Sequence, residues 1–414
     1  MIAKIHGARL SGEVSAPPSK SVAHRLLIAA SLKKGKTEIL NVGKSDDVLA
    51  TVRCLRALGA EITLKNGNAT VRGIELCPPA PHLDAGESGS TLRFMLPLAA
   101  SLTDCFSFGG TKKLLSRPNG ALLSALLSKG TEVSGTEARG RLRSGEFILD
   151  ASVSSQYTTG LLLALPTLSG DSRIRLVGDI VSRPYLDITL SVLDLAGIRY
   201  TQESDGFTLF GNQAYRLPDR VLCEGDWSGA AFPLVAGALF GAVTVRGLDP
   251  YSTQGDRLIL SVLKEAGAEV KENGDAITVC AKEKKAFSVD LTNAPDLAPV
   301  LSVLASACQG ESRLYGVERL RVKESDRIEA ILSMLRAAKI PCSYNREYIA
   351  VTGAIPTAAE FCGQNDHRIV MASALLASLS EGESRISTAE AVKKSYPAFF
   401  EDYKKLGGYA DVGL

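Results

Sequence analysis

Apolar residues along the chain gather into six stretches rich in alanine and leucine, each opened by a polar residue. The first is Pro17–Ala30, PPSKSVAHRLLIAA, and the others begin at Ser88, Ser154, Asp226, Asp296 and Asp366. Counted from Ser19, these starts lie 69, 66, 72, 70 and 70 residues apart. Serine and aspartate side chains cap the free N–H groups of a helix start, so each stretch is predicted to begin a helix. The nearly constant spacing predicts six copies of one unit.

A second group of helices is predicted between these stretches, as in TVRCLRALGAEIT and LILSVLKEAGAEVK. Short alternating segments follow and predict strands, with hairpin turns at Asn66-Gly67, Gly206 and Gly274. Each unit therefore reads as helix, strand, helix, strand and hairpin strand, an α/β fold. One of the second helices has Lys339 at its end. The other five end at a glycine that suits a left-handed C-cap: Gly59, Gly130, Gly197, Gly267 and Gly407.

The chain has 414 residues, more than one core usually supports, so two domains of three repeats each are expected. Pro17-Pro18 ends an N-terminal strand predicted over 3–14 and is one candidate hinge; the second lies between Leu222 and Asp226. The N-terminal strand would complete the final repeat. The predicted domains are 18–222 and 1–17 with 223–414, and closing of this double hinge would shut an interdomain cleft.

Composition narrows the function classes. Apolar residues make up 45% and charged residues 22%, as in globular proteins, and the net charge of +2 offers no global field for nucleic acid. Neither a signal peptide nor an apolar run of membrane-spanning length is recognisable, which predicts a cytosolic protein without membrane contact. The eight cysteines show no CxxC spacing, so buried free thiols are expected and no structural metal.

Helix starts carry the positive end of the helix dipole and can bind anions. Capped starts occur in every helical protein, and each alone is explained by stability. The chemistry added to these starts goes beyond capping, and six of them meeting at one cleft would hold a polyanion. The added residues are Lys20, Ser21, Arg25, Arg93, Ser154, Ser155, Gln156, Asp296, Asp366, His367 and Arg368.

The most charge-dense segment is LRVKESDR, residues 320–327. Such a run is usually a solvated helix start, but this one joins a predicted strand to a helix, where functional loops lie. Lys323 and Arg327 suit phosphate or carboxylate groups, and Glu324 between them suits proton transfer. Asp296 offers a second carboxylate.

Three further residues keep two interpretations. Arg117 and Lys394 each precede a helix, where each is a surface cation or an anion ligand. His367 is either a site imidazole or a residue that orients Arg368. The motifs of nucleotide hydrolysis, hydride transfer, zinc proteolysis and serine esterases are missing from the sequence.

Nine segments, in order, resemble the EPSP synthase family, the 3-phosphoshikimate 1-carboxyvinyltransferases of the shikimate pathway: PPSKSVAHR, GESGSTLR, SRP, SSQY, SRPYLDIT, PDLAP, LRVKESDR, NDHR and KKSYP. The resemblance implies a two-domain inside-out α/β barrel of six βαβαββ units. It also implies transfer of the enolpyruvyl group of phosphoenolpyruvate to the 5-hydroxyl of shikimate 3-phosphate, without metal or organic cofactor, in a cytoplasmic enzyme expected to be a monomer.

By position in these motifs, the resemblance implies the site residues. Asp296 and Glu324 would share the proton transfers with Lys20. Shikimate 3-phosphate would contact Lys20, Ser21, Arg25, Ser154, Ser155, Ser182, Tyr185, Asp296 and Lys323. Phosphoenolpyruvate would contact Lys20, Gly89, Arg117, Gln156, Arg327, Arg368 and Lys394.

The chain departs from many relatives at two positions. Glu87 stands where many have asparagine, and Arg319 where some have asparagine before the RVKE segment. The family is also the target of glyphosate, and a side chain at Gly89 would intrude on the pocket. We therefore expect inhibition by glyphosate at roughly micromolar concentration.

Two rival functions are a related transferase and a protein without catalytic activity. The related enolpyruvyl transferase that acts on UDP-N-acetylglucosamine has KN where this chain has Lys20-Ser21, and usually a loop cysteine just before the RP pair; the nearest upstream cysteine here is Cys105. A catalytically silent anion-binding scaffold would be expected to have lost some of Lys20, Asp296, Glu324 and Lys394. All four are present.

Overall fold

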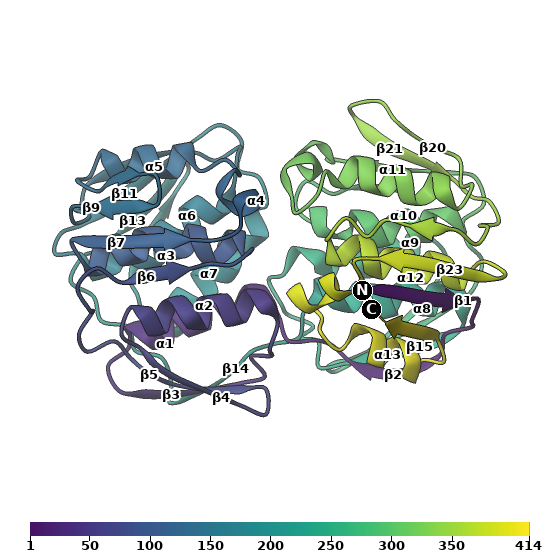
Figure 1. The fold of residues 1–414 in the computed structure, drawn as a ribbon, viewed down its shortest axis with the longest axis horizontal. Coiled ribbons are helices and arrows are strands. Elements are labelled where there is room, and N and C mark those ends of the chain that lie inside the picture. Colours follow the sequence, from purple (N-terminus) through teal and green to yellow (C-terminus); the bar gives the residue numbers. More distant parts are fainter. Residues whose placement is uncertain (414) are drawn as a thin grey trace. The chain divides into compact units, whose positions relative to one another are not determined.

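The computed structural model describes residues 1–413 and divides into two compact units (Figure 1). Unit 1 combines Met1–Pro17 with Gly225–Leu414, of which Leu414 lies outside the described residues, and unit 2 is Pro18–Glu224. Each unit has a hydrophobic core of its own. Unit 2 is thus one continuous segment inserted into unit 1.

Unit 2 contains seven α-helices, a 3-10 turn and twelve strands. The helices are α1 (Lys20–Leu32), α2 (Asp46–Ala57), α3 (Gly89–Leu102), α4 (Lys112–Leu115), α5 (Gly120–Leu127), α6 (Ser155–Ala164), η1 (Leu165–Thr167) and α7 (Arg183–Leu195). The strands are β3 (Lys36–Leu40), β4 (Glu61–Lys65), β5 (Asn68–Arg72), β6 (His82–Asp84), β7 (Cys105–Gly109), β8 (Glu132–Ser134), β9 (Glu137–Arg139), β10 (Glu146–Asp150), β11 (Ser172–Val177), β12 (Tyr200–Glu203), β13 (Gly206–Leu209) and β14 (Arg220–Leu222).

Unit 1 is also built from helices, 3-10 turns and strands. Its helices and 3-10 turns are α8 (Trp227–Phe240), η2 (Gly255–Leu258), α9 (Ile259–Glu265), η3 (Pro295–Leu297), α10 (Ala298–Ser306), η4 (Glu318–Val322), α11 (Arg327–Ala337), α12 (His367–Ser378), η5 (Ala389–Lys394) and α13 (Phe399–Lys405). Its strands are β1 (Ile2–His6), β2 (Gly12–Ser15), β15 (Ala242–Arg246), β16 (Glu269–Asn273), β17 (Ala276–Cys280), β18 (Ser288–Asp290), β19 (Glu311–Tyr315), β20 (Cys342–Tyr344), β21 (Tyr348–Thr352), β22 (Glu360–Phe361), β23 (Glu383–Ser387) and β24 (Tyr409–Gly413).

Both units place helices inside and sheets outside. All residues of α10 and α12 are buried, as is nearly all of α8, whereas strands such as β10 alternate between exposed and buried positions. An alternating strand has one wet face and one packed face, and a helix that is apolar all round belongs in a core. The predicted inside-out α/β architecture is confirmed.

Six four-stranded sheets repeat one topology. In the sheet of β10, β11, β13 and β12, the first pair is parallel and joined through α6, and the next two pairs are antiparallel. This is the βαβαββ unit. In two sheets the first strand comes from elsewhere in the chain: β14 pairs with β3, and β2 pairs with β15.

The N-terminal segment differs from the prediction of one strand over 3–14. It forms two strands in different sheets, because β1 lies between β23 and β24 while β2 pairs with β15. Gly7 follows β1 and lets the backbone pass close to Ser380, since a Cβ there would clash with the Ser380 carbonyl oxygen. The first strand does complete the final repeat, as predicted. That repeat also continues into β24, which was not predicted.

The predicted helix caps are confirmed at five of six starts. Ser19, Ser88, Ser154, Asp226 and Asp366 each accept a hydrogen bond from a backbone N–H of the first turn. The prediction is wrong for Asp296, which lies within η3, so that α10 begins only at Ala298. Its carboxylate is engaged by cations of other segments instead.

The predicted helix ends are confirmed. All five C-terminal glycines have positive φ, between 68° and 104°, and Lys339 adopts the same left-handed conformation with φ 61°. Asn66 and Gly67 also have positive φ, as a two-residue hairpin turn requires. All eight cysteines are free, but only Cys54, Cys223 and Cys308 are buried, so the expectation of buried thiols is wrong for the others.

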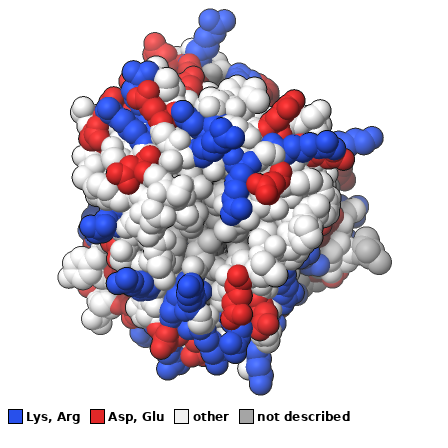
Figure 2. Space-filling view, turned by 90° about the vertical axis from the view of Figure 1, so that its left-hand side faces the viewer, with Lys and Arg blue, Asp and Glu red and all other residues white. Residues whose placement is uncertain are grey.

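On the face drawn in Figure 2, lysine and arginine are interspersed with aspartate and glutamate around an uncharged central area. This mixture accords with a net charge of +2. Among residues 1–413, no helix is long and apolar enough to cross a membrane.

Candidate functional site

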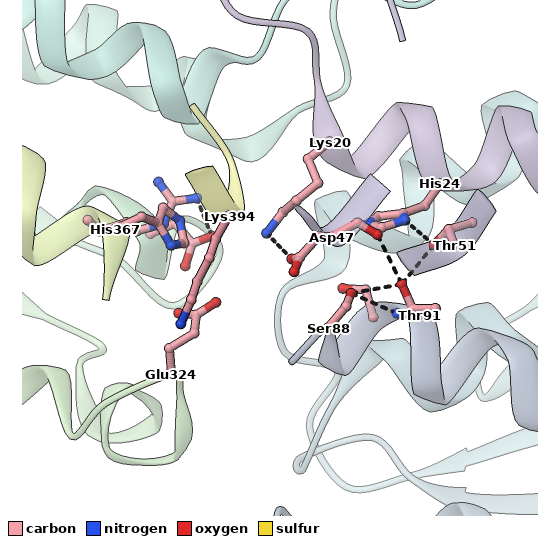
Figure 3. Close-up of polar contacts among 12 residues, drawn as sticks. Lys20, His24, Asp47, Thr51, Ser88, Thr91, Glu324, His367 and Lys394 are labelled. Carbon is pink, nitrogen blue, oxygen red and sulfur yellow. Dashed lines mark hydrogen bonds and ion pairs between the residues drawn. The ribbon is translucent and has the colours of Figure 1, made fainter. Parts of the chain in front are cut away.

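The first candidate residues of unit 2 lie at the start of α1. Ser19 caps the helix, and Lys20, its first residue, donates a 2.7 Å hydrogen bond from Nζ to Oδ2 of Asp47 (Figure 3). Asp47 lies in the first turn of α2, and both side chains are largely buried. The lysine ammonium is thereby held at a fixed place beside the positive end of α1.

Arg25 lies one turn further along α1 and is 2% exposed. Its guanidinium donates to the carbonyl oxygens of Ser21 and Tyr185 at 2.6 and 2.9 Å, and to the hydroxyls of Thr189 and Thr159 at 2.8 and 3.3 Å. Burial without a carboxylate partner lowers the pKa of Arg25 to about 9. The residue therefore ties the starts of α1 and α7 together and places a cation beneath them.

Gly89 opens α3 and lies against Arg117. A Cβ at Gly89 would lie 3.0 Å from Nη1 of Arg117, so the arginine occupies the space that a side chain would fill. The φ of Gly89 is not left-handed, and glycine serves here for close approach. Within the described residues, Nε of Arg117 is buried without a hydrogen-bond partner.

Arg93 organises the surroundings of Gln156. Its Nη1 donates to Oε1 of Gln156 at 2.6 Å, and its Nε and Nη2 bond to Asn119 and Pro118 of the segment that follows Arg117. The amide of Gln156 in turn donates to Oγ of Ser90 at 2.9 Å. The starts of α3 and α6 and the Arg117 segment are thus joined.

The remaining candidates of unit 2 lie at two more helix starts. Ser154 caps α6 by accepting from the backbone N–H of Gln156 at 3.3 Å, and Ser155 is the first residue of that helix. Ser182 precedes α7 with a left-handed φ of 54°, and Tyr185 lies in the first turn. These serines present hydroxyls and N–H groups at positive helix ends, which suits anionic groups.

In unit 1, Arg327 is the centre of a buried ion-pair cluster. It is 1% exposed and donates from Nη1 to Asp296 Oδ1 at 2.7 Å and from Nε to Asp366 Oδ2 at 2.8 Å. Its Nη2 also pairs with Glu324. Burial lowers the pKa of Arg327, but these carboxylates outweigh that effect and raise it well above the ordinary value.

Asp296 receives two more cations. Arg368 donates from Nη2 to Oδ2 at 2.9 Å, and Lys323 lies 3.4 Å from Oδ1. Burial and the neighbouring Arg327 lower the pKa of Lys323, although Asp296 opposes this. Lys394 donates from Nζ to the carbonyl oxygen of Asn365 at 2.6 Å, directly before the start of α12. Four cations thus accompany three carboxylates in this cluster.

Glu324, Asp366 and His367 offer ligand atoms within 4.8 Å of one another, the one such group among residues 1–413. Arg327 already pairs with both of these carboxylates and supplies the positive charge that a metal ion would bring. His367 was predicted either to act in the site or to orient Arg368. In the structure its side chain is 1% exposed, and its Nδ1 lies 4.0 Å from Oδ1 of Asp366.

Two groups that sequence reasoning passed over belong to these clusters. Asp47 holds Lys20, and the only sequence signal was its place in the first turn of a capped helix. Asp256 in η2 is 4% exposed, and burial together with the charge of Asp296 raises its pKa to about 7. Glu87 directly precedes the cap of α3, and Arg319 lies in η4.

The structure brings the candidate residues together in two groups, one in each unit. Fold and clusters define a class: an α/β enzyme equipped for anionic substrates and proton transfer. Solved structures share the fold: EPSP synthase from Acinetobacter baumannii has a TM-score of 0.85 at 24% identity, each chain fully covered. The enolpyruvyl transferase NikO from Streptomyces tendae has a TM-score of 0.79 at 16% identity, with 99% of this chain and 98% of that chain covered.

Sequence comparison gives the particular family. The model of EPSP synthase (3-phosphoshikimate 1-carboxyvinyltransferase) matches residues 5–403. The 3-phosphoshikimate 1-carboxyvinyltransferase of Clostridium kluyveri is 39% identical over 98% of this chain and 97% of its own length. That of Methanothrix thermoacetophila is also 39% identical, over 98% of both chains. The chain belongs to the EPSP synthase family, transferases of the shikimate pathway.

Proposed function

We propose that the chain transfers the enolpyruvyl group of phosphoenolpyruvate to the 5-hydroxyl of shikimate 3-phosphate, and that residues of both units act in this one reaction. The observation that carries the proposal is the family match over residues 5–403 in a chain that keeps Lys20, Asp296, Glu324 and Lys394. The products are 5-enolpyruvylshikimate 3-phosphate and inorganic phosphate.

The reaction is an addition followed by an elimination. The 5-hydroxyl oxygen forms a bond to C2 of phosphoenolpyruvate and gives up its proton, while C3 gains a proton and becomes a methyl group. The tetrahedral intermediate then loses a methyl proton to re-form the double bond, as the bond between C2 and the phosphate oxygen breaks. Each stage needs one proton acceptor and one donor held close to the reacting atoms.

In our proposal Asp296, Glu324 and Lys20 make these proton transfers. Asp296 and Glu324 are carboxylates held by arginines, so their oxygens keep a defined geometry. Lys20 is held by Asp47 at the first turn of α1. Because these proton donors and acceptors are held in place, less entropy is lost in reaching the reactive geometry.

The anionic groups of the substrates are bound by the remaining candidates. For shikimate 3-phosphate these are Ser21, Arg25, Ser154, Ser155, Ser182, Tyr185 and Lys323, in addition to Lys20 and Asp296. For phosphoenolpyruvate they are Gly89, Arg117, Gln156, Arg327, Arg368 and Lys394, in addition to Lys20. The unpartnered Nε–H of Arg117 supports this role, because an anion would satisfy it.

The experiment that tests the proposal measures phosphate release from phosphoenolpyruvate in buffer with EDTA, once with shikimate 3-phosphate and once with UDP-N-acetylglucosamine. We expect release with shikimate 3-phosphate alone. Release with only the sugar nucleotide would contradict the acceptor, and silence with both would favour the non-catalytic scaffold. We further propose that the protein acts as a cytoplasmic monomer, which light scattering of the purified chain and cell fractionation would check.

A further inference from the structure

A row of buried polar side chains runs beside the Lys20–Asp47 pair (Figure 3). His24 of α1 lies 2.7 Å from the hydroxyl of Thr51 of α2, measured from Nδ1, and that hydroxyl lies 2.7 Å from the hydroxyl of Thr91 of α3. Thr91 also lies 2.8 Å from Oγ of Ser88, the cap of α3. All four side chains are at most 1% exposed. The row joins three helices of unit 2, α1, α2 and α3.

Within this row, Thr91 reaches the backbone of Asp47. The hydroxyl of Thr91 lies 3.3 Å from the Asp47 carbonyl oxygen, within hydrogen-bond distance, while the carboxylate of Asp47 accepts from Lys20 at 2.7 Å. The first turn of α2 is therefore anchored to α3 at the residue that holds the lysine. A shift of this turn would move the ammonium of Lys20 with it.

The hydrogens along the row have one consistent order. Each hydroxyl has a single hydrogen, and the one on Thr91 is used by the Asp47 carbonyl oxygen or by Ser88. The short contact between Thr91 and Thr51 then needs the hydrogen of Thr51. Thr51 has none left for the imidazole, so Nδ1 of His24 donates to it.

The environment of His24 agrees with this order. Burial, with further effects of Lys20 and Arg25, lowers the pKa of His24 well below its ordinary value, so the ring is neutral and carries one N–H. Among residues 1–413, Nε2 of His24 has no hydrogen-bond partner and is buried. The ring also packs edge-on against Phe94 at 6.2 Å between centroids, which holds its plane.

We propose that His24, acting through Thr51 and Thr91, is a positioning residue that fixes the first turn of α2 and thereby the Asp47 carboxylate that places the Lys20 ammonium. The proposal rests on the role given to Lys20 under the proposed function. His24, Thr51 and Thr91 act through other residues and touch neither substrate.

The first test breaks the row without changing its volume. Thr91→Val and Thr51→Val remove the hydroxyls, and we expect kcat to fall about tenfold or more, with the KM for shikimate 3-phosphate changed much less. Thr91→Ser keeps the hydroxyl and should restore kcat. The matched control is Thr37→Val, since the hydroxyl of Thr37 is also buried in unit 2 but has no partner among the described residues.

The second test does not depend on turnover. The rate of acylation of Lys20 by acetic anhydride in the folded protein, read by mass spectrometry from the peptide that contains Lys20 after proteolysis, reports how firmly Asp47 holds the ammonium. We expect Lys20 to react several-fold faster in Thr91→Val than in the parent and the Thr37→Val control. In parallel, ¹⁵N NMR of the His24 ring should show the Nδ1–H tautomer in the parent and its loss in Thr51→Val.

The outcomes separate the two proposals. A fall in unfolding stability with unchanged kcat and unchanged Lys20 acylation would overturn the positioning role and leave the row as helix packing. Faster acylation with unchanged kcat would retain the positioning of Lys20 but remove Lys20 from the chemistry. An Nε2–H tautomer in the parent would contradict the order of hydrogens, whereas failure of phosphate release in the parent would count against the proposed function alone.

Discussion

Glu324 is the residue whose chemistry can be tested most directly. It pairs with Arg327 through one oxygen of its carboxylate and lies in the charge-dense segment before α11. Glu324→Gln keeps the shape and a hydrogen-bond acceptor but removes the proton-accepting group. We expect kcat to fall about 10²- to 10⁴-fold with little change in shikimate 3-phosphate affinity.

The matched control for Glu324 is Glu318→Gln, an exposed carboxylate in η4. Steady-state kinetics and calorimetric titration with shikimate 3-phosphate would give the two quantities. Unchanged turnover of Glu324→Gln would remove this residue from the mechanism.

Gly89 tests the phosphoenolpyruvate subsite. In Gly89→Ala the new methyl group would lie 3.0 Å from Nη1 of Arg117, so the guanidinium must move. We expect the KM for phosphoenolpyruvate to rise about tenfold, as for the loss of one well-placed ionic hydrogen bond, and glyphosate inhibition to weaken with it. Gly120→Ala, where a Cβ meets nothing within 4 Å, is the control. An unchanged KM would separate Gly89 from the subsite.

Asp256 gives a pH dependence of stability with a defined sign. Its folded pKa of about 7 exceeds the unfolded value near 3.9, so between these pH values the folded state binds a proton that the unfolded state has lost. The extra proton stabilises the folded state at low pH, so the free energy of unfolding falls as pH rises from 4 to 7. Asp256→Asn has no such loss, and its stability relative to the parent should increase by on the order of 3 kcal/mol over this range.

Urea unfolding of the parent and of Asp256→Asn at several pH values would measure this difference. Asp411→Asn, an exposed carboxylate of β24, should show none. A difference independent of pH would show that Asp256 is ionised in the folded protein throughout.

At the scale of helices and strands, the ends of the second helices form a natural comparison. Lys339 adopts φ 61° where the other five repeats have glycine. A side chain in this conformation costs about 1 kcal/mol, partly offset because glycine has a more flexible unfolded state. Lys339→Gly should therefore raise the free energy of unfolding by roughly 0.5 kcal/mol.

The opposite change provides the control for Lys339. Gly197 has φ 68°, and the nearest atom to an added Cβ lies 3.9 Å away, so Gly197→Ala tests backbone conformation alone. It should lower the free energy of unfolding by about 1 kcal/mol. Chemical denaturation measures both variants, and the same sign of change in the two would contradict this account.

Helix ends were predictable because their signals are local. Serine or aspartate at a start and glycine at an end act on N–H and carbonyl groups within one turn. The cap predicted at Asp296 was wrong because its carboxylate accepts hydrogen bonds from Arg327 and Arg368, which lie 31 and 72 residues away in the sequence. The row from His24 to Ser88 was hidden for the same reason, since it exists only after three helices have packed.

The split of the N-terminal segment into β1 and β2 was also beyond local reasoning. Alternation of apolar residues runs loosely through both strands, and nothing local shows that they belong to different sheets. Their partners, β23 and β15, are set by the packing of the whole of unit 1.

For the whole molecule, the insertion of unit 2 into unit 1 predicts independent folding. Unit 2 has its own core, and all twelve of its strands pair within it. A peptide of residues 18–224 should therefore unfold in one cooperative transition and bind neither substrate productively. Circular dichroism in urea and amide NMR dispersion would test this, and an unfolded peptide would show that unit 2 needs unit 1.

Unit 1 lacks this independence at its beginning. β1 is a central strand of the last sheet, paired with β23 at Glu383–Ser387 and with β24 at Tyr409–Gly413. On the ribosome, β1 emerges well before its partners and must therefore remain unpaired until about 380 further residues have been made. At about 5 to 20 residues per second this wait lasts roughly 20 to 75 s, while unit 2 is already complete. β1 is thus synthesised before the rest of its sheet and pairs only when that sheet is complete.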